Sequence, residues 1–144
     1  MNDNDRALCA AAAGVLRGCG AVAAWGLALT SIAGLVLALT GRSLSLSAWI
    51  AYAAVGVAGL AERYFGLRLR LDTALFEGLA RGTIGSFAAL DGALQGLGLR
   101  RTADTPRPIA DRIAGTRQLM QKHGILVTLQ TALFAVALAM QDWR

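Results

Sequence analysis

The sequence predicts an all-α membrane protein with three transmembrane helices and a cytoplasmic amphipathic helical hairpin between the second and the third. Two observations predict this class. The 144 residues are 56% hydrophobic and only 16% charged, with a mean hydropathy of +0.52, whereas soluble domains are about 45–50% apolar and about 25% charged. Three uncharged runs are each long enough to cross a bilayer. The composition excludes a disordered chain, and two cysteines are too few for a disulfide scaffold.

The uncharged runs are residues 20–40, 44–61 and 124–141. As helices they would measure roughly 31, 27 and 27 Å, close to the thickness of the hydrocarbon layer. None contains proline or alternates with period two, so we expect helices rather than barrel strands. Buried helices of a soluble core are a poor alternative, because such runs usually have about 10–14 residues. A cleaved signal peptide is a poor alternative for the first run, which is too long and follows Asp3 and Asp5.

Basic residues are unevenly distributed around these runs. Only Arg42 lies between the first two, whereas residues 62–123 hold ten basic and six acidic residues. Because Lys and Arg are enriched on the cytoplasmic side of membrane proteins, we expect the N-terminus and residues 62–123 to be cytoplasmic. The C-terminus then lies outside the inner membrane of a bacterium. Residues 1–19 are expected to form a cytoplasmic N-terminal helical segment.

Residues 62–123 are predicted to form the hairpin. Apolar residues recur every three or four positions on both sides of a loop at 100–108, which contains both prolines. Several glycines weaken the first helix, and a break is expected near residues 82–85. Residues 67–71 alternate like a strand but have no partner strand, so we expect helix there. The apolar face of the first helix is the predicted partner-binding surface, formed by Phe76, Leu79, Phe87, Leu90 and Leu94.

Small and polar residues at helical spacing mark the faces on which the three spans are expected to pack. Small residues let helices approach closely where lipid offers no hydrophobic drive, and a glutamine in a span needs a partner on another helix. No charged residue lies within a run, which argues against proton-coupled or voltage-driven transport. The predicted helix-packing residues are Gly26, Thr30, Gly34, Gly56, Gly59, Gln130 and Thr131.

No catalytic constellation is visible, and we expect neither a cofactor nor a metal site. The single histidine, His123, cannot form a bis-histidine haem site within one chain. It is expected to cap a helix end, with a proton-relay or ligand role as the alternative. Cys9 and Cys19 match no metal motif and are expected to fill packing space, with lipidation of Cys19 as the alternative.

Surface charge indicates a lipid partner rather than a nucleic acid. Acidic residues are interspersed among the basic ones and no aromatic residues alternate with them, which is unlike a nucleic-acid interface. Three basic residues follow the second run and are expected to attract anionic phospholipid at the membrane surface. They are Arg63, Arg68 and Arg70.

These features favour a non-enzymatic accessory, scaffold or assembly subunit of a larger membrane complex. Its partners would be other membrane-protein subunits or further copies of itself. The alternative is a homo-oligomeric channel or small transporter lined by the region of Thr128, Gln130 and Thr131. An enzyme that acts on lipid headgroups ranks last, because no metal set or nucleophile–base pair accompanies the candidate acids. Those acids are Asp72, Glu77 and Asp91.

Overall fold

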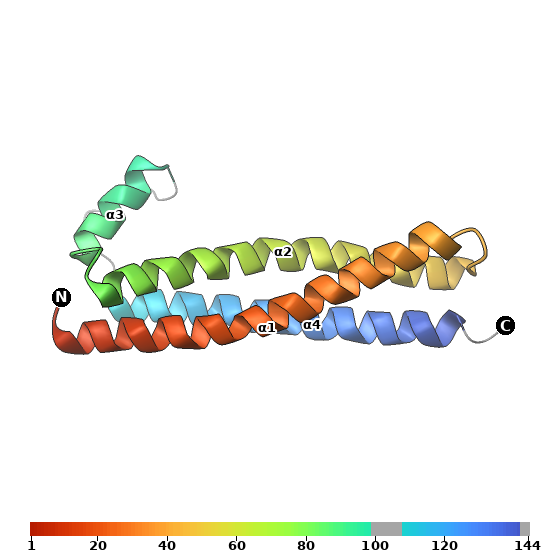
Figure 1. Cartoon of the computed structure of the whole chain (residues 1–144), viewed down its shortest axis with the longest axis horizontal. Coiled ribbons are helices and arrows are strands. Elements are labelled where there is room, and N and C mark those ends of the chain that lie inside the picture. Colours follow the sequence, from red (N-terminus) through yellow and green to blue (C-terminus); the bar gives the residue numbers. More distant parts are fainter. Residues whose placement is uncertain (99–107, 142–144) are drawn as a thin grey trace. The chain divides into compact units, whose positions relative to one another are not determined.

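The computed structural model describes residues 1–98 and 108–141, and within them the chain is helical apart from short turns. This confirms the all-α prediction, and residues 67–71 are helix as expected. Nearly all of the loop expected at 100–108 lies outside the described residues. The four helices are α1 (Asp3–Thr40), α2 (Leu46–Arg81), α3 (Phe87–Gly96) and α4 (Ile109–Gln141) (Figure 1).

Local sequence explains where these helices begin and end. At the start of α1, the Asp5 amide donates to Asn2 Oδ1 at 2.7 Å and the Asn2 amide donates to Asp5 Oδ2 at 3.1 Å, a reciprocal arrangement of the capping-box kind. Ser45 and Ser86 accept backbone N–H groups at the starts of α2 and α3. Gly82 has a φ of 77°, a left-handed conformation that favours glycine, and it ends α2 inside the expected break.

The chain divides into two compact units, each assembled from separate segments. Unit 1 comprises Met1–Gly18 and Leu69–Gln118, and unit 2 comprises Cys19–Arg68 and Leu119–Arg144. Helices α1, α2 and α4 each contribute one part to each unit, whereas α3 belongs to unit 1. Residues 20, 61 and 124 are ends of the predicted spans, but no helix begins or ends there. Helices α1, α2 and α4 continue through these positions.

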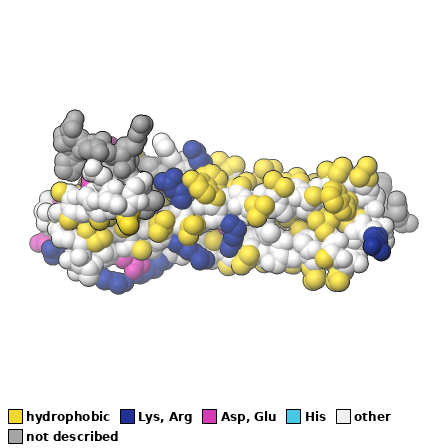
Figure 2. Space-filling view, turned by 90° about the horizontal axis from the view of Figure 1, so that it is seen from above, with side chains coloured by type: hydrophobic (Ala, Val, Ile, Leu, Met, Phe, Trp, Pro, Cys, Tyr) yellow, Lys and Arg dark blue, Asp and Glu magenta, His cyan; other side chains and the backbone are white. Residues whose placement is uncertain are grey.

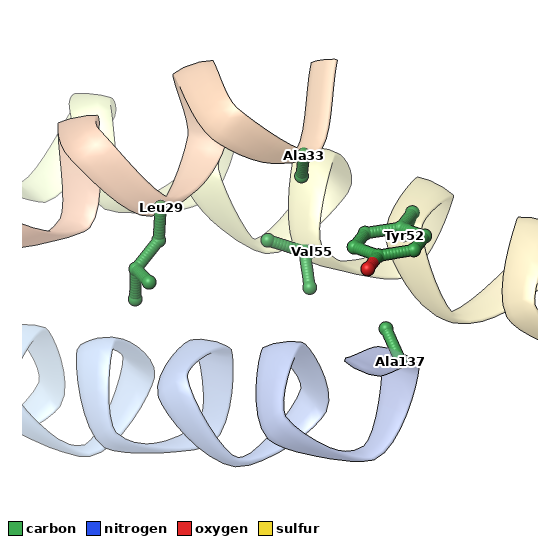
Figure 3. Close-up of a cluster of buried hydrophobic side chains, with 5 residues drawn as sticks. All are labelled: Leu29, Ala33, Tyr52, Val55 and Ala137. Carbon is green, nitrogen blue, oxygen red and sulfur yellow. The ribbon is translucent and has the colours of Figure 1, made fainter. Parts of the chain in front are cut away.

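In unit 2, α1 and α4 run parallel and α2 runs antiparallel to both. The levels of the contacts show this: Ala23 and Thr30 of α1 lie level with Arg63 and Gly59 of α2, whereas Tyr52 and Glu62 of α2 bond to residues 141 and 123 of α4. Side chains from all three helices meet in an apolar core, where they point toward one another (Figure 3). The buried members of this core are Leu29, Ala33, Tyr52, Val55 and Ala137.

Unit 1 is held together by apolar burial and by polar links between helices. Arg112 of α4 donates to both carboxylate oxygens of Asp91 in α3, at 2.6 and 2.7 Å. The same guanidinium lies over the Phe87 ring, 5.4 Å from its centroid. Thr116 of α4 donates to Asp72 of α2 at 3.0 Å. The buried apolar residues of unit 1 are Cys9, Ala13, Leu16, Leu69, Phe76, Leu79 and Leu90.

Within the described residues, two helices rather than three are long and apolar enough to cross a membrane, namely α1 and α4. The prediction of a third such span at 44–61 is wrong on this criterion. Helix α2 begins only at Leu46, so the first two residues of the predicted span lie outside it. A window of spanning length must then include the charged Glu62 and Arg63, which lower its hydropathy.

Candidate functional site

Three polar side chains are buried inside unit 2. Glu62 and Gln130 have no exposed surface, and His123 is 1% exposed. Burying a carboxylate, an imidazole or an amide is costly unless each finds a hydrogen-bond partner. These residues come from α2 and α4, and carbonyl groups of α1 accept from Gln130 and from Arg63, the neighbour of Glu62. We describe them together with Arg63 and Thr30 as the polar cluster.

Glu62 is the centre of the polar cluster. Its Oε1 lies 2.8 Å from His123 Nε2, and its Oε2 accepts from Arg63 Nε at 2.8 Å. Arg63 also donates through Nη2 to the Ala23 carbonyl at 2.6 Å. A single acid on α2 therefore connects to α4 directly and to α1 through its neighbouring arginine. Because Glu62 is an acceptor when ionised, the imidazole nitrogen facing it carries the proton.

Gln130 forms the second part of the polar cluster, between α4 and α1. Its Nε2 donates to the Gly26 carbonyl at 3.1 Å and to Thr30 Oγ1 at 2.8 Å. Thr30 in turn donates to the Gly26 carbonyl at 2.9 Å. The Gly26 carbonyl can only accept, so the amide NH₂ must face it and the amide oxygen must point away. That oxygen, Gln130 Oε1, is buried and has no hydrogen-bond partner among the described residues.

Two glycines bring the backbone close to the polar cluster. A Cβ at Gly26 would lie 3.1 Å from the Glu62 carboxyl carbon and 3.2 Å from Gln130 Oε1. Glu62 and Gln130 therefore lie against the same point of α1. A Cβ at Gly66 would lie 3.6 Å from Glu62 Oε1 and 3.9 Å from His123 Nε2, which is ordinary contact distance. Because residue 66 is glycine, no side chain of its own covers the Glu62–His123 hydrogen bond.

Most of the predicted helix-packing residues meet between the helices of unit 2. Gly59 lies against Thr30 so closely that a Cβ there would overlap the threonine hydroxyl. Thr131 accepts from Trp25 Nε1 at 3.1 Å. Gly26, Thr30 and Gln130 are joined as described above. Gly34 and Gly56 differ, since a Cβ at either position would meet no atom within 4 Å.

The predicted partner-binding residues divide into two groups. Phe76, Leu79 and Leu90 are at most 5% exposed, so the chain itself covers them. Phe87 and Leu94 are partly exposed. The predicted lipid-binding arginines divide similarly, because Arg63 bonds to Glu62 and Ala23, whereas Arg68 and Arg70 are exposed.

The residues named for the alternative functions are separated or already engaged. Thr128 is exposed and donates to the Gly124 carbonyl, whereas Gln130 faces inward, so the two do not share one surface. The three candidate acids form links inside unit 1. Asp72 accepts from Thr116, Glu77 pairs with Arg17 and Arg81, and Asp91 pairs with Arg112.

Sequence reasoning did not identify the Glu62–His123 pair. Glu62 immediately follows the second uncharged run, and His123 immediately precedes the third. In antiparallel neighbouring helices, the residue after one run lies level with the residue before the other. This juxtaposition was therefore visible in the predicted topology once the second and third runs were placed side by side.

No group of three or more His, Cys, Asp and Glu side chains that could hold a metal ion occurs in residues 1–98 and 108–141. What the polar cluster offers chemically is an acid–imidazole pair, an arginine and one open amide acceptor.

Comparison of the chain with protein-family models, curated proteins and solved structures finds no match.

Proposed function

We propose that this protein is an integral membrane protein that serves, without enzymatic activity, as an accessory, scaffold or assembly subunit of a larger membrane complex. One observation carries the proposal. In α1 and α4 only 22% of the apolar spanning window is buried inside the chain. The core helix of a soluble protein would bury most of such a window. Something other than this chain therefore covers the apolar surface.

The exposed apolar residues of unit 2 support a lipid environment. Large hydrophobic side chains remain open on all three of its helices, as at Leu35 with 58%, Leu60 with 71% and Ile125 with 70% exposure. Figure 2 shows such side chains spread over one face of the chain. Exposed apolar surface on this scale marks a membrane or protein interface. The polar groups that a membrane would not tolerate face inward, in the polar cluster.

The helix directions of unit 2 support a further step about α2. Because α1 and α4 run parallel, they can both cross a bilayer only if the chain returns between them. Helix α2 runs antiparallel to both in unit 2 and makes that return. Its uncharged part is short for a span on its own, but α1 and α4 flank it and Glu62 is satisfied by His123 and Arg63. On the positive-inside rule, the N-terminus is cytoplasmic and the end of α4 is outside.

Two glycines that face away from unit 2 supply the place where a partner helix would approach. A side chain at Gly34 of α1 or Gly56 of α2 would meet no atom of the chain within 4 Å. Glycines on an open helix face allow close helix–helix contact in lipid. In unit 1, the partly exposed Phe87 and Leu94 are the remaining part of the predicted partner-binding surface.

The test is native mass spectrometry of the protein extracted gently from its own membrane together with its neighbours. A defined mass that contains a second polypeptide is the expected result. Gly34→Leu should remove that partner, whereas Gly20→Leu adds the same side chain to α1 at another open position and should leave it bound. A protein that is always recovered alone would contradict the proposal.

The second candidate function is a homo-oligomeric channel or small transporter. A single defined oligomer of this chain in the same experiment would favour it. Its lining would not be the predicted region of Thr128, Gln130 and Thr131, because Gln130 is enclosed between α1 and α4 of one chain. Flux through Gln130→Leu in liposomes tests this point. Unaltered flux is expected, and altered flux would mean that the predicted region lines the pore after all.

A further inference from the structure

The polar cluster contains more chemistry than helix packing needs. An apolar pair at positions 62 and 123 would join α2 to α4 without the desolvation cost of a carboxylate and an imidazole. Ionisable residues that face the interior of membrane helices are most often functional, and Glu and His recur in proton relays. The sequence alone offered no charged residue within a span, but the structure encloses Glu62 completely.

We propose that the Glu62–His123 pair is a proton-binding site. One proton passes from a hydronium ion to a carboxylate oxygen of Glu62, next to the 2.8 Å hydrogen bond that already holds the Nε2 proton of His123. The hydronium O–H bond breaks and a carboxyl O–H bond forms, and release reverses the step. No electron moves, and no co-reactant other than water is required.

The groups around the pair can accommodate an added positive charge. Helix α2 contributes the negative Glu62 and the positive Arg63, and α4 contributes His123 and the neutral amide of Gln130. Helix α1 presents the carbonyl oxygens of Ala23 and Gly26. With a neutral imidazole the polar cluster carries no net charge. With one more proton it carries +1, and the carbonyl dipoles of α1 face it with their negative ends.

Gln130 gives the bound proton a structural consequence. Two atoms that lie 3.1 and 3.2 Å from one point can be at most 6.3 Å apart, so the Glu62 carboxyl carbon and Gln130 Oε1 are near neighbours. Both are acceptors while Glu62 is ionised, and Oε1 has no donor among the described residues. A protonated carboxyl group is a donor. Proton binding therefore supplies the donor that the buried amide oxygen lacks.

Gly66 provides the route by which a proton reaches the pair. Residue 66 is partly exposed, and a side chain there would point at Glu62 Oε1 and His123 Nε2. Because residue 66 is glycine, it places no side chain over the pair, which the rest of the chain encloses, with Glu62 at 0% and His123 at 1% exposure. A larger residue at this position would add bulk beside the pair and hinder the entry of a proton.

The test uses the fact that the chain has one histidine. With isotopically labelled histidine and glutamine in lipid nanodiscs, imidazole NMR signals come from His123 alone, and the Gln130 amide signal is identified by its absence in Gln130→Leu. We expect both sets of signals to change together in one step as the pH is varied. His123 signals that do not respond to pH, or that respond while Gln130 stays constant, would overturn the proposal.

Two further variants separate a proton-binding site from a purely structural pair. Glu62→Gln keeps the size of the side chain but cannot bind a proton, so the Gln130 signal should lose its pH response. Gly66→Leu should slow the exchange of the imidazole proton with water by about tenfold or more, and Gly66→Ala, whose Cβ fits, should change it little. If the wild-type protein, Gly66→Leu and Gly66→Ala all exchanged this proton at equal rates, the route at Gly66 would be refuted, and the site with it. The wild-type protein and Gly66→Ala serve as the reference, because both retain every group of the cluster.

Discussion

Gly59 is a point of close approach between α1 and α2 in unit 2. A Cβ at this position would overlap the hydroxyl of Thr30 and lie 2.9 Å from its methyl carbon. Thr30 cannot simply rotate away, because its hydroxyl donates to the Gly26 carbonyl and accepts from Gln130. Gly59→Ala should therefore force the two helices apart and destabilise the fold by about 1–3 kcal/mol. The measurement is thermal unfolding followed by circular dichroism in detergent.

The matched control is Gly56→Ala, one turn earlier on the same helix. A Cβ at Gly56 would meet no atom within 4 Å. Alanine is favoured over glycine inside a helix by about 0.8–1.0 kcal/mol, so this variant should be neutral or slightly stabilising. Equal loss of stability in both variants would mean that the helices do not approach at Gly59.

The buried Cys9 should be an unreactive thiol. Burial raises the pKa of the Cys9 thiol above its ordinary value, the negative charge of Asp5 raises it further, and Arg112 acts in the opposite direction. Burial also raises the pKa of the Cys19 thiol, so the expected difference rests on access: maleimide should label the buried Cys9 more slowly than the partly exposed Cys19 at neutral pH. The measurement is labelling followed by mass spectrometry in Cys9→Ser and Cys19→Ser, each of which keeps one thiol.

The same raised pKa fixes the direction of a stability effect. A neutral thiol is favoured in the folded protein, so folding stability is retained below the ordinary thiol pKa and falls as the pH rises through it. Labelling of Cys9 should therefore accelerate at alkaline pH more than that of an unburied thiol. Labelling of Cys9 at the rate of a free thiol at neutral pH would contradict its burial.

At the scale of single residues, the sequence predicted the neutral contacts better than the ionisable ones. Gln130 was expected to need a partner on another helix, because its side chain cannot easily bond to its own, and it does bond to Gly26 and Thr30. Glu62 and His123 were treated separately, as the flank of a run and as a helix cap. Their hydrogen bond joins residues 61 positions apart, and local patterns contain no information about such a pair.

At the scale of elements, helix type was predictable and span length was not. The long apolar runs of α1 and α4 indicate helices even if their ends are placed a few residues differently. Both helices are long and apolar enough to cross a membrane. In α2, the length of the span depended on the first two residues of the predicted run, 44 and 45. Ser45 accepts the Ala48 amide and fixes the start of the helix at Leu46, so both residues lie outside it. The apolar face of the predicted hairpin was predicted to bind a partner, but at Phe76, Leu79 and Leu90 the chain itself provides the cover.

An ion pair between Arg112 and Asp91 links α3 to α4. Arg112 makes two short bonds to Asp91 and lies over Phe87, and both charged side chains are largely buried, at 12% and 16% exposure. Arg112→Lys keeps the charge but cannot form the two-pronged contact. We expect hydrogen exchange in Phe87–Gly96 to become at least about tenfold faster, since charged hydrogen bonds contribute about 1.5–3 kcal/mol.

Arg81→Lys is the control for this variant. Arg81 pairs with Glu77 one turn away on α2, and its side chain is 65% exposed, so the substitution should change exchange in unit 1 little. Unchanged exchange in α3 after Arg112→Lys would show that the ion pair does not hold the helix.

At the scale of the whole molecule, the helix directions in unit 2 are the strongest constraint on membrane placement. Composition indicated a membrane protein, and the uncharged run at 44–61 predicted a span that α2 does not provide on length and composition. The parallel course of α1 and α4 can be inferred only from contacts that set α2 antiparallel to each of them, such as Ala23–Arg63 with α1 and both Tyr52–Gln141 and Glu62–His123 with α4. It makes a definite prediction: the two ends of α2 lie on opposite sides of the bilayer.

Two open positions allow that prediction to be checked in a cysteine-free background. Ser43 is exposed in the turn before α2, and Gly85 is exposed after it, with no atom within 4 Å of an added Cβ. In sealed membrane vesicles of known orientation, a membrane-impermeant maleimide should label Ser43→Cys only from the outer side and Gly85→Cys only from the cytoplasmic side. Labelling of both from one side would show that α2 does not cross, and labelling of both from either side in intact vesicles would show that unit 2 is not embedded in the bilayer. Either result would remove the membrane part of the proposed function, because the parallel spans α1 and α4 cannot both cross unless α2 crosses between them.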